Sequence, residues 1–192
     1  MRAAWRAMVA EHIDAKGLVF VDEMGSNTSL TPLYGWSRRG ERALAKVPRN
    51  WGANVTLLAS ISVEGTGPSL AVEGSTTREV FEVYLEHFLA PALRSRQVVV
   101  KDNLSAHKGG RVRELVEEQC CELVYLPPYY SPDLNPIEEA FAKLKTLLRR
   151  ARARTREALI EVMGRALDAV TARDARGFFE HCGYRTSAQL LW

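Results

Sequence analysis

Short apolar runs, each bounded by turn residues, divide the chain into strands that are interspersed with helices. Five runs have the length and composition of buried strands, and they lie at residues 18–24, 54–63, 68–74, 97–102 and 121–127. The first three follow one another without a helix and predict an antiparallel meander. A short extra strand is expected at 43–47, inside the long polar connection 25–54. The run at 97–102 is too apolar for a sheet edge and predicts a central strand.

Apolar residues at helical spacing predict the remaining elements. The expected helices are one from a Thr76/Glu79 capping box to Leu89, one at Lys108–Gln119, one starting at Pro136, one at about 156–171 and a short one ending near Cys182. The order β-β-β-α-β-α-β-α-α predicts an α/β protein, in which a mixed five-stranded sheet is flanked by helices. With no linker or internal repeat, residues 1–192 are expected to form a single domain.

The segment 127–136 holds four of the eight prolines and predicts a rigid loop before a helix. Asn135 is the expected N-cap, because Asn favours that position and Pro136 suits the first helical position.

Composition narrows the classes of protein that this pattern allows. An apolar content of 46% and a charged content of 26% exclude disordered and collagen-like chains. No apolar run approaches the roughly 20 residues of a membrane span, and the first residues lack a secretory signal. Three cysteines without metal-binding spacing favour a reducing compartment. A cytoplasmic protein without a membrane partner is expected.

The formal charge of +3 hides an uneven distribution. Residues 143–156 carry seven basic side chains and no acid, which leaves −4 on the rest of the chain. Such clusters often contact nucleic-acid phosphates, although a solvated helix face would have the same composition. The candidate DNA-binding residues are Lys143, Lys145, Arg149, Arg150, Arg152, Arg154 and Arg156.

Three carboxylates stand at the ends of predicted elements. Asp22 and Asp102 come at the ends of apolar strands, and Glu138 begins the helix after the Pro-rich loop. Each has an ordinary structural explanation, since Asp is common in turns and Glu is favoured in a first helical turn. Ligands, however, gather beyond the carboxyl ends of strands in open α/β sheets. Three carboxylates in one crevice would repel one another without a cation.

Divalent ions with oxygen ligands relieve that repulsion, and Mg²⁺ uses carboxylates together with substrate phosphate oxygens. Two such ions can activate a water or sugar hydroxyl and stabilise the leaving oxygen of a phosphoryl displacement. Asp22, Asp102 and Glu138 beside a basic helix are therefore candidates for both catalysis and metal binding in a nuclease or strand-transfer enzyme.

Three blocks of sequence resemble the catalytic blocks of DDE transposases, specifically the bacterial insertion-sequence branch of the mariner superfamily. They are VFVDEMG, VVVKDNLSAH and LPPYYSPDLNPIEEAFAKLK, and the stretches YGWSRRGER and FFEHCGY are also similar to that branch. The resemblance implies a ribonuclease-H-like fold, with Asp22, Asp102 and Glu138 as the catalytic, metal-binding trio and Asn103 and His107 in supporting roles.

The resemblance further implies Mg²⁺- or Mn²⁺-dependent cleavage at transposon ends, with two ions, followed by strand transfer into target DNA. It implies a homodimer acting in the bacterial cytoplasm, associated with the nucleoid. Only seventeen residues precede the first strand, so the N-terminal helix-turn-helix domain of this branch is expected to be absent. A separate helix-turn-helix polypeptide from an upstream frame is then an expected partner. A catalytically silent DNA-binding relic and another ribonuclease-H-like nuclease stay open as alternatives.

Overall fold

Five strands form one mixed sheet, as the sequence predicts. The computed structural model describes Trp5 and residues 14–48, 52, 54–102, 110–127 and 131–185. The strands are β1 (Leu18–Ser26), β2 (Val55–Ser62), β3 (Gly65–Glu73), β4 (Val98–Lys101) and β5 (Glu122–Tyr125), in the spatial order β3-β2-β1-β4-β5. β1, β2 and β3 pair antiparallel, whereas β4 pairs parallel with both β1 and β5. The predicted meander and the central position of the fourth strand are confirmed.

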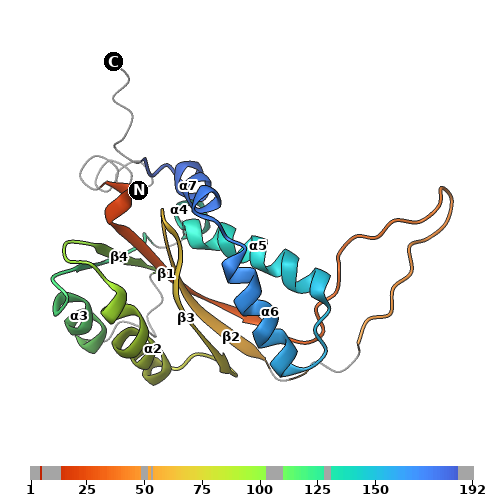
Figure 1. Ribbon diagram of the computed structural model, residues 1–192, viewed down its shortest axis with the longest axis horizontal. Coiled ribbons are helices and arrows are strands. Elements are labelled where there is room, and N and C mark those ends of the chain that lie inside the picture. The colour runs from red at the N-terminus through yellow and green to blue at the C-terminus, as the bar shows by residue number, and fades with distance from the viewer. Residues whose placement is uncertain are drawn as a thin grey trace, which may run out of the picture.

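Helices cover both faces of this sheet (Figure 1). The helical elements are η1 (Ala15–Gly17), α2 (Arg78–Tyr84), the π-helical η2 (Leu85–Leu89), η3 (Ala90–Ala92), α3 (Gly110–Glu117), α4 (Ser131–Leu134), α5 (Pro136–Ala151), α6 (Arg156–Asp168) and α7 (Ala172–His181). Side chains of α5, α6 and α7 pack on one face, and those of α2, η2 and α3 pack on the other.

Several predicted boundaries were wrong. The N-cap of α2 is Thr77, whose side chain accepts a hydrogen bond from Val80 N, and not Thr76. Residues 43–47 form no strand, and part of the Pro-rich loop is the short helix α4. The helix expected to reach residue 171 ends at Asp168, because Thr171 begins α7 with a capping box of its own.

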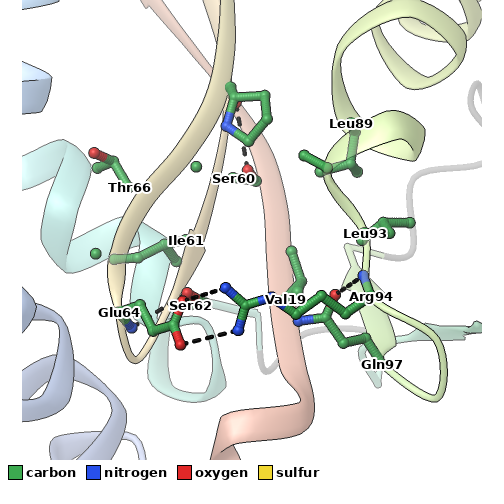
Figure 2. A pocket seen from close by; sticks show the side chains of 14 residues that line it. Val19, Ser60, Ile61, Ser62, Glu64, Thr66, Leu89, Leu93, Arg94 and Gln97 are labelled. Carbon is green, nitrogen blue, oxygen red and sulfur yellow. Dashed lines mark hydrogen bonds and ion pairs between the residues drawn. The ribbon is translucent and has the colours of Figure 1, made fainter.

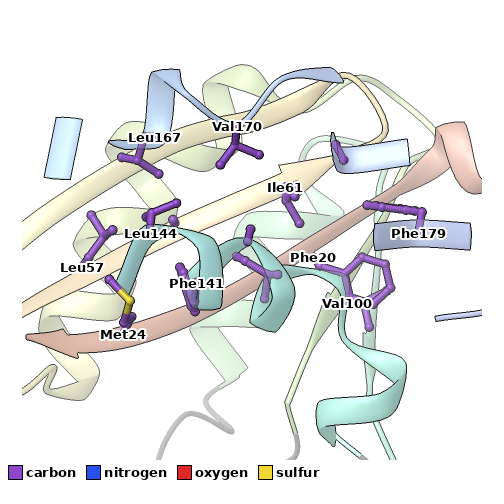
Figure 3. Close-up of a cluster of buried hydrophobic side chains, with 14 of the residues drawn as sticks. Phe20, Met24, Leu57, Ile61, Val100, Phe141, Leu144, Leu167, Val170 and Phe179 are labelled. Atoms are coloured by element: carbon purple, nitrogen blue, oxygen red, sulfur yellow. The ribbon is translucent and has the colours of Figure 1, made fainter. Parts of the chain in front are cut away.

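Alternation along β1 determines which face each side chain occupies. Phe20 and Met24 belong to the core under α5, whereas Val19 and Val21 belong to the core under α2 and α3. The first of these cores is the larger, and Figure 3 shows Phe20 and Val100 of the sheet among side chains from α5, α6 and α7. Asp22, between Phe20 and Met24, therefore lies on the α5 face.

The connection after β1 extends away from the rest of the protein as a long arm (Figure 1). Its side chains include Tyr34 and Trp36, which are 92% and 104% exposed. Arg154 holds the base of the arm by donating hydrogen bonds to the carbonyl oxygens of Thr28 and Leu30. In the described part of the chain, no helix is long and apolar enough to cross a membrane.

Candidate active site

The parallel pairing of β1 and β4 brings two of the predicted carboxylates together. Val21 lies opposite Lys101 in the register, so continuing it by one residue places Asp22 beside Asp102. The alternation of side chains gives Asp22 the face that α5 covers, because Phe20 precedes it by two positions. Asp102 follows directly after the last residue of β4, and its charge acts on Asp22. Glu138 lies in the first turn of α5, and its charge acts on Asp22. The structure thus gathers the predicted trio in one region.

Asp22 is the most buried of the three, at 7% exposure. Its Oδ1 accepts a hydrogen bond from Glu23 N at 2.8 Å, and its Oδ2 accepts one from Asn135 Nδ2, also at 2.8 Å. Burial, together with the negative charges of Asp102 and Glu138, raises the pKa of Asp22 to about 7, against the lowering effect of the Glu23 hydrogen bond. Ionisation of Asp22 in the folded protein therefore has a free-energy cost.

Asp102 has a cation of its own. Lys101 Nζ lies 2.9 Å from Asp102 Oδ1, and the Lys101 side chain is only 2% exposed. The same ammonium lies 4.6 Å from the ring centre of Phe81 in α2, an arrangement that a cation–π interaction favours. Sequence reasoning missed Lys101, although a lysine inside an otherwise apolar strand is a recognisable signal.

Glu138 is half-buried, and its neighbour Glu139 is turned to another partner. Glu139 Oε1 contacts His181 Nδ1 at the end of α7, so this second carboxylate ties α5 to α7. Among the described residues, no group of three or more Asp, Glu, His or Cys side chains is close enough to hold a metal ion. Like-charge repulsion and the Lys101 contact both oppose closer approach of the three acids.

Asn135 occupies the predicted N-cap position of α5, but its side chain makes no capping hydrogen bond. Its amide instead donates to Asp22, which lies 113 positions earlier in the chain. The predicted N-cap position is confirmed, and the contact with Asp22 is a feature that the prediction did not include. The supporting candidates Asn103 and His107 lie outside the described residues.

The seven basic residues fall into two groups. Lys143 pairs with Asp174 of α7 at 2.8 Å, Arg154 holds the arm, and Arg156 pairs with Glu73 and Glu157. Lys145, Arg149, Arg150 and Arg152 form no ion pair with another described residue. Of these seven side chains, only those of the second group are therefore paired with neither an acidic residue nor a backbone carbonyl oxygen within the described part of the chain.

A cavity of about 310 Å³ lies elsewhere (Figure 2). Its lining includes Val19 and Leu89, which belong to the core on the α2 face, and the Arg94 and Glu64 side chains form an ion pair at its edge. Because Asp22 lies on the opposite face of the sheet, this cavity is separate from the carboxylates.

Sheet order, helical layers and the position of the carboxylates define an α/β protein with a ribonuclease-H-like fold. Residues 17–160 match the sequence family described as DDE superfamily endonuclease. The chain belongs to this family, and the resemblance to the mariner superfamily is confirmed.

Individual relatives agree with that assignment. The chain is 29% identical over 145 residues to the transposable element Tcb1 transposase of Caenorhabditis briggsae, which covers 70% of this chain and 53% of the relative. The chain thus spans about half the length of that curated relative. The Mos1 mariner paired-end complex with Mn has a TM-score of 0.73 at 17% identity, over 94% of this chain and 57% of that one. The catalytic domain of Mos1 mariner transposase has a TM-score of 0.65 at 15% identity, over 94% of this chain and 84% of that one.

Proposed function

We propose that this chain cleaves DNA at transposon ends and transfers the freed strand into target DNA, using divalent metal ions. The observation that carries the proposal is that the buried Asp22 of β1 feels the charges of both Asp102, which follows the neighbouring strand β4, and Glu138, in the first turn of α5. Membership of the DDE superfamily endonucleases supports the reaction class.

The donor set fits Mg²⁺ or Mn²⁺. Asp22, Asp102 and Glu138 offer only hard oxygen ligands, and the carbonyl oxygen of the Asn135 side chain is buried without a hydrogen-bond partner. Burial and the charges of Asp102 and Glu138 raise the pKa of Asp22, and a bound cation would offset both effects. The related Mos1 complex was solved with Mn. When bound, two ions would supply activation of the attacking oxygen and stabilisation of the leaving oxygen.

The residues of the chain have separate tasks in this proposal. Asp22 and Asp102 would hold the ions from the side of the sheet, and Glu138 would hold them from α5. Lys101 fixes one oxygen of Asp102 by donating a hydrogen bond to it. The rigid pairing of β1 with β4 keeps the two aspartates at a constant separation, as positioning of phosphoryl-transfer groups requires.

For DNA binding, we assign the phosphate contacts to Lys145, Arg149, Arg150 and Arg152. At about 1.5 Å per residue, Arg149 lies roughly 16 Å along α5 from Glu138, which corresponds to about five base pairs of B-DNA. A duplex cut at the carboxylates would therefore reach this end of α5. Contacts of this kind position DNA without reading its sequence. Transposon-end recognition would then require another domain or polypeptide, and a homodimer is proposed on the resemblance alone.

A supercoiled-plasmid nicking assay with Mn²⁺ tests the proposal. Asp22→Asn, Asp102→Asn and Glu138→Gln are each expected to abolish nicking while non-specific DNA binding persists. Glu23→Gln and Glu139→Gln are matched controls, because each removes a neighbouring carboxylate, and both variants are expected to keep nicking activity. Nicking that survives any of the three active-site changes would refute the role given to that residue. DNA binding by the wild-type chain without nicking would instead support the silent relic.

A further inference from the structure

The side chain of Asn135 connects the loop before α5 to the buried carboxylate of Asp22. Asn135 is 1% exposed and Asp22 is 7% exposed, and their hydrogen bond is 2.8 Å long. When the carboxylate is ionised, as binding of a cation requires, this hydrogen bond is about twice as strong as a neutral one. The contact therefore fixes the orientation of the carboxylate more firmly than an ordinary polar contact would.

Helix capping does not explain the presence of Asn135. Thr155 and Thr171 are the N-caps of α6 and α7, and each accepts a hydrogen bond from a backbone N–H two or three residues into its helix. The Asn135 side chain makes no such bond. Its function at this position is thus directed to Asp22 and not to the helix.

The amide also carries a cost that a purely structural residue would avoid. Asn135 Oδ1 is buried and has no hydrogen-bond partner, an arrangement that destabilises the folded state. An apolar side chain of similar volume would remove that cost. Such a side chain could not donate the hydrogen bond that Asp22 accepts from Asn135.

Tyr184 holds the backbone next to Asn135 in place. The Tyr184 hydroxyl donates to Leu134 O at 2.6 Å and accepts a hydrogen bond from Trp5 Nε1 at 3.1 Å. Its ring packs on Phe20, with ring centres 5.1 Å apart. Phe20 precedes Asp22 by two residues on the same face of β1, so Tyr184 supports both ends of the Asn135–Asp22 contact. Tyr184 is the last residue of the FFEHCGY stretch, so this stretch is connected to the site through Tyr184.

We propose that Asn135 is a positioning residue that preorganises the Asp22 carboxylate for a divalent metal ion. Each Asp22 oxygen accepts one hydrogen bond, from Glu23 N or from Asn135, and each keeps a second lone pair for the ion. Without Asn135, the carboxylate must be ordered when the ion binds, and this ordering lowers the affinity. This inference rests on the proposed function in one respect, namely that a divalent ion binds at the site. It adds a fourth side chain to the site.

Two substitutions test the proposal in the full chain. Asn135→Ser removes the contact with Asp22 but supplies a good N-cap, and Asn135→Leu keeps the volume while removing both the donor and the unpaired oxygen. Loss of a side chain that orients a metal ligand typically weakens binding 10- to 100-fold. We therefore expect the dissociation constant for Mn²⁺, measured by electron paramagnetic resonance or calorimetry, to rise about 10- to 100-fold in both variants. Their melting temperatures in EDTA are expected to fall by several degrees, as is also expected of the control variant Thr155→Val, because each loses one hydrogen bond.

Thr155→Val is the matched control, because it removes a real helix cap far from the carboxylates. It is expected to lower the melting temperature and leave the Mn²⁺ dissociation constant unchanged. A wild-type dissociation constant in either Asn135 variant would overturn the proposal. So would equal weakening of Mn²⁺ binding in Thr155→Val, since the effect would then follow from helix capping.

The nicking assay separates this proposal from the proposed function. If the wild-type chain binds Mn²⁺ but never nicks a plasmid, the proposed function fails, and the ratio of dissociation constants still decides the role of Asn135. If the wild-type chain does not bind Mn²⁺ at all, both proposals are refuted.

Discussion

Replacing Asp22 by Asn should stabilise the metal-free protein at alkaline pH, although it removes a side chain that we assign to the active site. Burial and two neighbouring carboxylates raise the pKa of Asp22 from 3.8 to about 7. The native state therefore prefers protonated Asp22, and this favourable contribution is complete below pH 3.8 and lost as the pH rises through 7. Asn cannot ionise, so the variant does not lose this stabilising contribution as the pH rises.

The magnitude follows from the pKa difference. At about 1.4 kcal/mol for each pKa unit, the change from 3.8 to about 7 corresponds to about 4 kcal/mol at pH 8. About 2.5 kcal/mol of this develops between pH 5 and pH 8. That difference is the better quantity to measure, because changes in packing that do not depend on pH cancel from it. The isosteric amide also fits, since Asn135 can turn its unpaired Oδ1 toward the new NH₂ group.

Urea unfolding followed by tryptophan fluorescence at pH 5 and pH 8, in EDTA, measures the effect. We expect the stability advantage of Asp22→Asn to grow by about 2.5 kcal/mol across this range. Saturating Mg²⁺ should reduce the advantage of the variant at pH 8 from about 4 to about 1.3 kcal/mol, since an ion at 100 times its dissociation constant stabilises the wild type by about 2.7 kcal/mol. An advantage that is the same at both pH values would refute the reasoning about burial. If Glu23→Gln showed an equal pH-dependent gain in stability, the effect would follow from the general loss of negative charge and not from the burial of Asp22.

Four further changes test the contacts around the site and in the basic segment. Lys101→Met removes the ammonium from a pair that is almost buried and should lower the free energy of unfolding by about 3 kcal/mol, as urea titration would show. Tyr184→Phe removes the hydroxyl that holds Leu134, which should cost about 1–2 kcal/mol and weaken Mn²⁺ binding in the same direction as the Asn135 variants. Lys143→Met should lower the melting temperature and leave DNA affinity unchanged, whereas Lys145→Met should leave the melting temperature unchanged. Lys145→Met should also reduce the slope of log affinity against log salt concentration by about 0.9, measured by fluorescence anisotropy.

Local sequence patterns predicted the strands and the acidic trio because the relevant information is local. A run such as LVFVDEM indicates a buried strand and also a carboxylate near the end of that strand. The parallel pairing that brings Asp22 to Asp102 then follows from the order of the elements. Basic residues were harder to assign. Composition could not distinguish Lys143, which pairs with Asp174, from Lys145, because the partner lies on a helix 31 residues later.

Asn135 shows what local reasoning leaves out: it gives the N-cap position correctly but not the partner of the side chain, and the reason is a competition between two hydrogen bonds. A side-chain cap is worth about 1 kcal/mol, whereas a hydrogen bond to a charged group is worth about 1.5–3 kcal/mol. The N-cap threonines Thr155 and Thr171 cap their helices. Asn135 lies against the buried Asp22, and there the stronger bond wins at the expense of the cap. A residue that fits a local rule in sequence but does not use it in the structure is therefore a marker of the functional site.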